Sequence, residues 1–225
     1  MGEVDFLDLG RIDYRAALQR QEEAVAEIAA GGDERVFLLE HPHVITLGRR
    51  ADERNLIDRH GPEGITIEVH RIGRGGDVTY HGPGQLVGYP LLHLDRRRRD
   101  LHLFLRDLEE SLIRTATTFG VSAFRRPGLT GVWTESGKLA SIGIGVRRWV
   151  TWHGFALNVS TDLRYFGLMH PCGIPDCPMT SLERLTGRSV PMPEVKSTFK
   201  QAFVEVFGRG IKASKSSYPG REQRA

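Results

Sequence analysis

Apolar residues recur at the spacing of a helix face in three segments of the chain. The first segment covers residues 13–30, where Asp13 can cap the first turn. The second covers residues 100–119, with its apolar side chains along one face. The third covers residues 193–207 and is followed by Gly208, a typical helix stop. The pattern therefore predicts three helices.

Short apolar runs and alternating stretches predict strands between these helices. Ile65, Ile67 and Val69 alternate with polar residues, which is typical of a strand with one buried face. The other predicted strands are residues 4–9, 36–39, 44–47, 86–94, 131–134, 138–146 and 149–159, and residues 162–179 are predicted to be mostly loop. Interleaved strands and helices indicate an α/β (α+β) fold. No repeat or linker divides the chain, so we expect one domain over residues 4–208 and a flexible tail over residues 209–225.

The composition of the 225 residues is that of an ordinary globular protein, with 40% hydrophobic and 26% charged residues. A net charge of +3 is too small to indicate nucleic-acid binding. No run approaches the roughly 18 apolar residues of a membrane span, and residues 1–10 lack the apolar core of a secretory signal. The two cysteines could staple little of the fold. We therefore expect a cytoplasmic protein that binds neither nucleic acid nor membrane.

A glycine-rich segment, residues 74–85, has glycines on both sides of a short strand-like core. It matches neither the phosphate-binding loop nor the dinucleotide fingerprint. Glycine lets a second chain or a ligand approach the backbone closely, so the segment is interpreted either as a binding wall or as two turns around an edge strand. Small residues also interrupt the predicted strands at residues 138–145 and 153–158. Three such strands around one cavity would leave a slot for a slim apolar chain.

Lys138 is the only lysine in the first 195 residues of a chain that contains 31 lysines and arginines. An arginine stays protonated, whereas a lysine can give up a proton. Lys138 therefore marks either a position where proton transfer matters or a surface position filled by chance.

Cys172 lies in a Pro-Cys-Gly sequence, which predicts a sharp turn that presents the thiol. A thiol is nucleophilic as its thiolate, which a nearby cation favours. If the fold brings Lys138 to it, the thiol is primed for acyl transfer through a thioester. Two other interpretations stay open: a buried structural cysteine, and a metal site with His170 and Cys177, whose Cys-x4-Cys spacing is poor for structural zinc.

Together these motifs resemble those of the octanoyltransferases of the lipoyl pathway. The resemblance rests on Arg-Gly-Gly and Thr-Tyr-His-Gly-Pro-Gly-Gln within residues 74–85, and on residues 138–143, 148–158, 171–174 and 180–182, in matching order and spacing. It covers about residues 4–208. It implies the fold of the biotin and lipoate protein ligase catalytic domain, a mixed β-sheet flanked by helices.

The resemblance implies transfer of an octanoyl group from octanoyl-acyl carrier protein to a lysine of a lipoyl-accepting domain. The acceptors would be lipoyl domains of 2-oxoacid dehydrogenase complexes and the glycine cleavage H protein. Cys172 would carry the acyl thioester and Lys138 would activate it, without cofactor or metal. The substrate-contacting residues that the resemblance implies are Arg74, Gly75, Gly76, Asp77, Val78, Thr79, Tyr80, His81, Ser141, Ile142, Gly143, Gly154, Phe155 and Ala156.

Two alternative functions would use the same scaffold. An ATP-dependent lipoate or biotin ligase would form an acyl-adenylate and need no cysteine, and a non-catalytic acyl-binding module would tolerate Cys172→Ser. His81 and His153 would either orient the substrate or be structural, and the other histidines have no motif support. The arginine run at residues 96–99 is interpreted as a solvated loop or as a docking surface for an acidic carrier protein.

Overall fold

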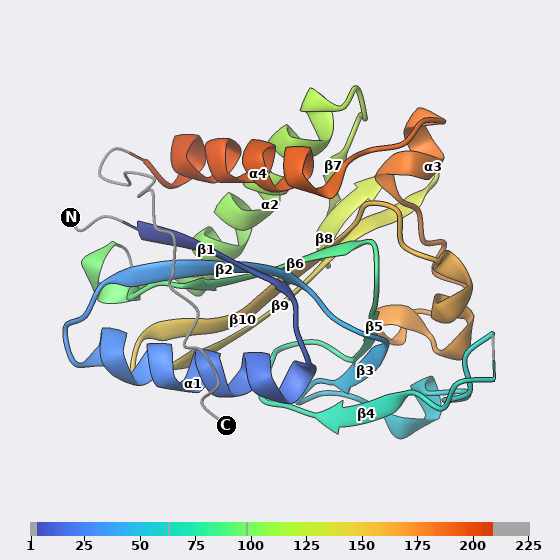
Figure 1. Cartoon of the computed structure of the whole chain (residues 1–225), viewed down its shortest axis with the longest axis horizontal. Coiled ribbons are helices and arrows are strands. Elements are labelled where there is room, and N and C mark those ends of the chain that lie inside the picture. Colours follow the sequence, from blue (N-terminus) through green and yellow to red (C-terminus); the bar gives the residue numbers. More distant parts are fainter. Residues whose placement is uncertain (1–3, 63, 98, 209–225) are drawn as a thin grey trace, which may run out of the picture.

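A seven-stranded β-sheet runs through the molecule in the order β1-β2-β6-β10-β9-β8-β7 (Figure 1). Its strands are β1 (Val4–Arg11), β2 (Glu34–Glu40), β6 (Gln85–Leu91), β7 (Phe124–Arg126), β8 (Leu129–Thr134), β9 (Gly137–Arg147) and β10 (Val150–Asn158). β1 and β2 are parallel, and the other neighbours are antiparallel. The computed structural model describes residues 4–62, 64–97 and 99–208, so the tail expected for residues 209–225 lies outside the described residues.

A smaller three-stranded sheet lies beside one end of the large sheet (Figure 1). Its central strand β3 (Val44–Leu47) pairs parallel with β4 (Glu68–Arg71) and antiparallel with β5 (Val78–His81). Short 3-10 helices are η1 (Glu53–Asn55), η2 (Leu94–Arg96), η3 (Leu163–Leu168) and η4 (Pro171–Gly173). β5 is an edge strand of this sheet, and it belongs to the glycine-rich segment.

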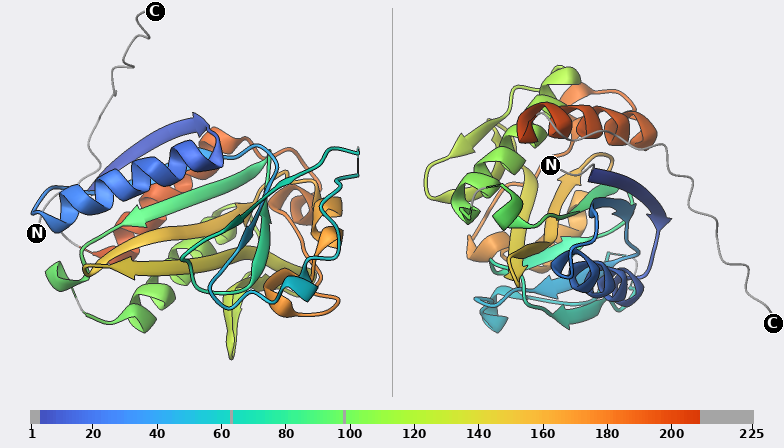
Figure 2. Two further views of the ribbon diagram at one scale, coloured as in Figure 1. Left: turned by 90° about the horizontal axis from the view of Figure 1, so that it is seen from below. Right: turned by 90° about the vertical axis from the view of Figure 1, so that its left-hand side faces the viewer.

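Helices cover both faces of the large sheet. α1 (Tyr14–Ala29) lies on one face, and α2 (Leu101–Thr118) and α4 (Met192–Phe207) lie on the other (Figures 1 and 2). A short helix, α3 (Leu182–Thr186), precedes α4. The three predicted helices and the α/β class are thus confirmed. The Asp13 carboxylate accepts from the backbone N–H of Arg15 at 2.8 Å and so caps α1 as predicted.

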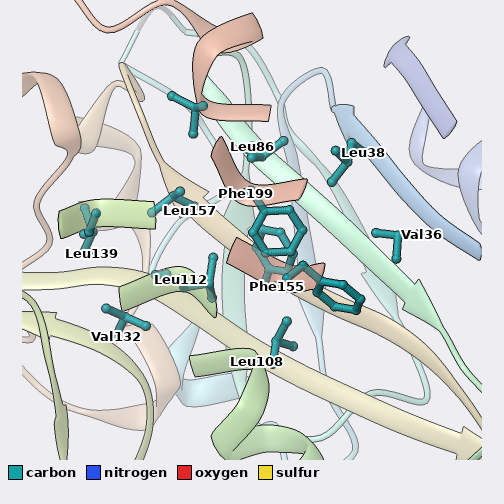
Figure 3. Close-up of a cluster of buried hydrophobic side chains, with 14 of the residues drawn as sticks. Val36, Leu38, Leu86, Leu108, Leu112, Val132, Leu139, Phe155, Leu157 and Phe199 are labelled. Carbon is teal, nitrogen blue, oxygen red and sulfur yellow. The ribbon is translucent and has the colours of Figure 1, made fainter. Parts of the chain in front are cut away.

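The alternation of side chains along β2 places one apolar set against each helix layer. Val36 and Leu38 belong to the cluster under α2 and α4, where Phe155 and Phe199 also lie (Figure 3). Phe37 and Leu39 belong instead to the cluster under α1. A sheet packed on both faces is rigid, and it holds the ends of β9 and β10 in place for the site described below.

The strand predicted from Ile65 was wrong at its start. The backbone turns here, with Gly61 donating to the Ile65 carbonyl at 2.8 Å and Gly64 at a φ of 75°. Ile65 is 46% exposed, and β4 begins only at Glu68. A local turn therefore overrides the alternating pattern.

Two residues of the arginine run, Arg96 and Arg97, are anchored to other parts of the protein, whereas Arg98 lies outside the described residues. Arg96 donates to the carbonyls of Gly32 and Ile28, at the C-terminal end of α1. Arg97 pairs with the buried Glu34 carboxylate at 2.5 Å. These two arginines hold the chain after β6 against the end of α1 and the start of β2. No helix within the described ranges is both long and apolar enough to cross a membrane.

Candidate active site

Lys138 and Cys172 meet where β9 begins. The Nζ atom of Lys138 donates to Sγ of Cys172 at 2.9 Å, and the lysine is only 1% exposed. The backbone of Lys138 is fixed on both sides: its N–H donates to the Pro178 carbonyl at 2.8 Å, and its carbonyl accepts from Thr180 at 3.0 Å. The chain that follows the cysteine loop therefore pairs with β9 and brings the two side chains together.

The backbone of Cys172 adopts the left-handed conformation, with φ 60° and ψ 21°. Such a conformation is strained for a residue with a side chain, and strained residues of this kind cluster at functional sites. The turn is held by two hydrogen bonds, from Gly173 to the His170 carbonyl at 2.9 Å and from His170 to the Asn55 carbonyl at 2.8 Å. The sharp turn predicted around Cys172 is thus present, and it presents the sulfur to Lys138.

Room for the Lys138 side chain depends on Gly131 in β8. Gly131 has a φ of 129°, and a Cβ atom there would lie 2.8 Å from Cε of Lys138. Its N–H donates to the carboxylate of Glu109 at 2.9 Å, and Glu109 is fully buried on α2. The sequence motifs gave no signal for Glu109 or Gly131, because their roles arise from packing between distant segments.

A narrow cavity of about 40 Å³ adjoins the sulfur of Cys172. It lies between the glycine-rich segment and the strands β9 and β10. Of the substrate-contacting residues implied by the resemblance, it is lined by Arg74, Gly76, Asp77, Val78, Thr79, His81, Ser141, Ile142, Gly143, Gly154, Phe155 and Ala156. We call it the acyl cavity. Tyr14, Ile72, Tyr89 and His153 also line it, and of these the sequence drew attention only to His153.

Gly75 and Tyr80 lie elsewhere. Gly75 donates to the Ile144 carbonyl at 2.9 Å, so the glycine-rich segment lies directly on β9. The ring of Tyr80 stacks on Tyr165 with centroids 4.9 Å apart, and its hydroxyl is 2.7 Å from Nδ1 of His43. Tyr80 is therefore part of the apolar cluster of the small sheet.

The glycines make this close approach possible. A Cβ atom at Gly143 would lie 2.8 Å from the Gly75 carbonyl oxygen and 3.0 Å from Cδ of Arg74. Any larger residue at Gly143 would thus displace the glycine-rich segment from β9.

Two buried histidines, His81 and His153, line the acyl cavity, and a third, His41, lies with its ring centroid 5.9 Å from that of His81. We refer to the three as the buried histidine group. Burial lowers the pKa of His41 to about 4 and the pKa values of His81 and His153 to about 3. All three rings are therefore neutral at pH 7. No sequence motif singled out His41, whose Nε2 atom is 2.7 Å from the Tyr89 hydroxyl.

The tautomer of His81 follows from its neighbours. The amide nitrogen of Gln85 donates to Oδ1 of Asn158 at 2.9 Å, so its amide oxygen accepts from Nδ1 of His81, also at 2.9 Å. Nε2 of His81 is then an unprotonated acceptor. Nε2 of His153 is buried without a hydrogen-bond partner among the described residues, and the φ of His153 is 56°.

Arg74 places a fixed positive charge in the wall of the acyl cavity. It is 7% exposed and donates to the Thr46 carbonyl at 2.7 Å and to the Thr46 hydroxyl at 3.0 Å. Burial lowers the pKa of Arg74, and the nearby Cys172 and Asp77 oppose that shift. An arginine remains charged at neutral pH even so, and its field acts on the sulfur.

A second, wider cavity of about 340 Å³ also adjoins Cys172 and Lys138. We call it the outer groove. Its sides carry apolar residues from α2, β8, β9 and the segment after η4: Leu101, Leu105, Leu129, Ile142, Ile144 and Ile174. Arg49 and Arg50 line it as well. The sulfur thus stands at the junction of a narrow cavity and an open groove.

The metal interpretation of His170, Cys172 and Cys177 gains no support from the geometry. Within residues 4–62, 64–97 and 99–208, no group of three or more His, Cys, Asp or Glu side chains is arranged to hold a metal ion. Cys177 is buried, and burial raises its pKa.

The fold is that of known protein ligases. A lipoate-protein ligase A described as bound with ATP superposes with a TM-score of 0.69 at 14% identity, covering 95% of this chain and 88% of that one. A biotin protein ligase from Aquifex aeolicus gives a TM-score of 0.51 at 14% identity, covering 91% and 68%. At such identities these similarities show the fold alone, a mixed sheet flanked by helices as the resemblance implied.

The sequence defines the class more closely. Residues 13–204 match the family described as the lipoyl protein ligase A/B catalytic domain, and the chain belongs to this family. Its relatives include octanoyltransferases of Geotalea uraniireducens, 57% identical over 86% of this chain and 88% of the relative, and of Syntrophotalea carbinolica, 56% identical over 86% and 90%. The resemblance to octanoyltransferases is thereby confirmed.

Proposed function

We propose that this protein transfers an octanoyl group from octanoyl-acyl carrier protein to a specific lysine of lipoyl-accepting domains, through a thioester on Cys172. The acceptors would be lipoyl domains of 2-oxoacid dehydrogenase complexes and the glycine cleavage H protein. The observation that carries the proposal is the 2.9 Å contact between Lys138 Nζ and Cys172 Sγ at the junction of the two cavities. The octanoyltransferase relatives support the choice of acyl group.

In the first step the sulfur of Cys172 attacks the carbonyl carbon of the donor thioester. The sulfur attacks as a thiolate paired with the Lys138 ammonium, and the carrier thiolate leaves with a proton that this ammonium or water supplies. One thioester replaces another, so the step is nearly isoenergetic and needs no ATP. The octanoyl chain would lie in the acyl cavity, whose lining apart from Arg74 and Asp77 is uncharged at pH 7. The cavity of about 40 Å³ is smaller than this chain, so its walls would move apart as the chain enters.

In the second step the amine of the acceptor lysine attacks the Cys172 thioester. The nitrogen must lose a proton and the sulfur leaves as a thiolate, so Lys138, in contact with the sulfur, can carry the proton between them. An arginine at this position would keep the charge but would transfer a proton poorly. The buried guanidinium of Arg74 would favour the negative charge that develops in both steps.

Mass spectrometry of the acceptor tests this function. The purified protein, octanoyl-acyl carrier protein and a lipoyl domain are mixed without ATP, and the acceptor is expected to gain one octanoyl group on a lysine. Cys172→Ser is expected to abolish the gain, whereas Cys177→Ala, the matched control at the other thiol, is expected to retain it.

Two results would contradict the proposal. Acceptor modification that requires ATP and free octanoate would identify a ligase of the same fold. Modification that survives Cys172→Ser would remove the thioester intermediate.

A further inference from the structure

The acyl cavity and the outer groove meet at the sulfur of Cys172, so the two halves of a bound thioester substrate can occupy different spaces. A thioester has an acyl chain on one side of its carbonyl and a sulfur-bearing arm on the other. When Cys172 attacks that carbonyl, the chain and the arm must point into different spaces. Cys172 lines both the narrow cavity and the wide groove, so each half of the substrate has a space of its own.

The walls indicate which half each space accepts. The acyl cavity, at about 40 Å³, is too narrow for a branched arm, and apart from Arg74 and Asp77 its lining is neutral, so it favours the unbranched acyl chain. The outer groove has a volume of about 340 Å³ and is therefore much larger than the acyl cavity. Apolar side chains from α2 and β9 form its sides. The arm that links an acyl group to a carrier protein has two amides, a branched hydrocarbon centre and a phosphodiester. The outer groove suits its hydrocarbon part.

Arg49 and Arg50 supply the charge that such a phosphate would need. Both side chains are exposed and line the outer groove. Across residues 4–62, 64–97 and 99–208, neither guanidinium has a hydrogen bond or ion pair with another group. The Asp77 carboxylate also lines the groove, but it accepts from Asn55 at 2.7 Å and from the N–H of Val78 at 2.6 Å, so the two arginines leave a net positive charge there for an anion.

The backbone holds this arginine pair in register with the glycine-rich segment. The N–H of Arg49 donates to the Arg74 carbonyl at 3.0 Å, and the N–H of Arg50 donates to the Gly76 carbonyl at 3.4 Å. Asp77, the residue after Gly76, lies next to the cysteine loop: a Cβ atom on Gly173 would lie 2.7 Å from the Asp77 carboxylate. The arginines are thus tied to the same wall that faces the sulfur.

We propose that the outer groove binds the phosphate-bearing amide arm of the donor thioester, with Arg49 and Arg50 binding its phosphate. This assignment rests on the proposed function and names the part of the donor that the site recognises. The arm must leave the groove before the acceptor lysine can reach the thioester. The two half-reactions therefore use the groove in turn.

Two small donors that differ only in the phosphate test the assignment. The rate of Cys172 acylation is followed with octanoyl-phosphopantetheine and with octanoyl-pantetheine, for the parent protein, the double variant Arg49→Gln/Arg50→Gln and the control Arg188→Gln. Arg188 is exposed in the segment between α3 and α4. The quantity compared is the KM of the unphosphorylated donor divided by the KM of the phosphorylated donor.

We expect this ratio to be about 10 to 100 in the parent and in Arg188→Gln, and to fall toward one in the double variant. A ratio that stays at the parent value in the double variant would overturn the assignment. So would a double variant that is slowed mainly in transfer from pre-acylated enzyme to the lipoyl domain, because the arginines would then serve the acceptor. If neither donor acylates Cys172 in the parent, the proposed function itself fails, and the assignment fails with it.

Discussion

Replacing Lys138 by methionine or by arginine separates two roles of this side chain. Methionine removes both the charge and the exchangeable proton, whereas arginine keeps the charge and removes most of the capacity for proton transfer. The two half-reactions can be measured apart, as acylation of Cys172 by the donor and as transfer from acylated enzyme to the acceptor.

The geometry sets the expected size of each effect. At 2.9 Å and an effective dielectric constant of 20, an ammonium and a thiolate attract by about 6 kcal/mol. This is an upper limit, so Lys138→Met should slow acylation by up to about 10⁴-fold. Lys138→Arg is crowded, because Gly131 already lies close against Cε. Overpacking of this kind costs about 1 to 3 kcal/mol; taken as an upper limit on the rise in activation free energy, it should slow acylation by this variant by no more than about 100-fold.

The second half-reaction should respond differently. Loss of a positioned proton carrier typically costs about 10² to 10⁴ in rate, and arginine cannot replace the lysine in this role. Rapid-quench measurements of acyl transfer from octanoylated enzyme to a lipoyl domain should therefore find Lys138→Arg nearly as slow as Lys138→Met. Transfer by Lys138→Arg within about threefold of the parent would refute the proton-transfer role and leave only a charge effect.

Three further predictions follow from the same contacts. The Cβ atom of Gly131→Ala would collide with Lys138, so this variant should lower kcat at least about tenfold and the free energy of unfolding by about 1 to 3 kcal/mol. Steady-state rates and urea unfolding measure the two effects, and a kcat equal to that of the parent would refute the prediction. Alkylation of the native protein should modify Cys172 at least about tenfold faster than Cys177, whose pKa burial raises, and peptide mass mapping that finds equal rates would contradict this. The buried histidine group should make the free energy of unfolding fall as the pH drops from 6.5 toward 4. In this range the three histidines take up protons in the unfolded chain but stay neutral in the folded chain, where their pKa values are about 3 to 4. The expected slope is about 1.4 kcal/mol per pH unit for each histidine, and urea titrations with no slope in this window would contradict it.

The sequence identified the parts of the site that lie within compact motifs. Cys172, Lys138 and the residues of the glycine-rich segment could be chosen because each is unusual in its local context. The fold class followed from the interleaved strands and helices. The separation of Lys138 and Cys172 could not be predicted, since it depends on the chain around Met179 pairing with the start of β9.

Other parts of the site have no local signature. Tyr14 and Tyr89 come from α1 and β6 and meet only in the wall of the acyl cavity. Glu109 reaches Gly131 across the packing of α2 on β8. Tyr80 lies inside the recognised motif, but its ring packs in the core of the small sheet. A motif marks the segment that forms the site, and packing decides which of its side chains face the substrate.

Cys172 is proposed to carry the acyl group between donor and acceptor. Intact mass spectrometry of the protein, mixed with octanoyl-acyl carrier protein in the absence of any acceptor, tests this most directly. We expect a gain of one octanoyl group, mapped to the peptide containing Cys172 and released by addition of a lipoyl domain. A protein that gains no octanoyl group while still modifying the acceptor, or that carries the group on another residue, would contradict it.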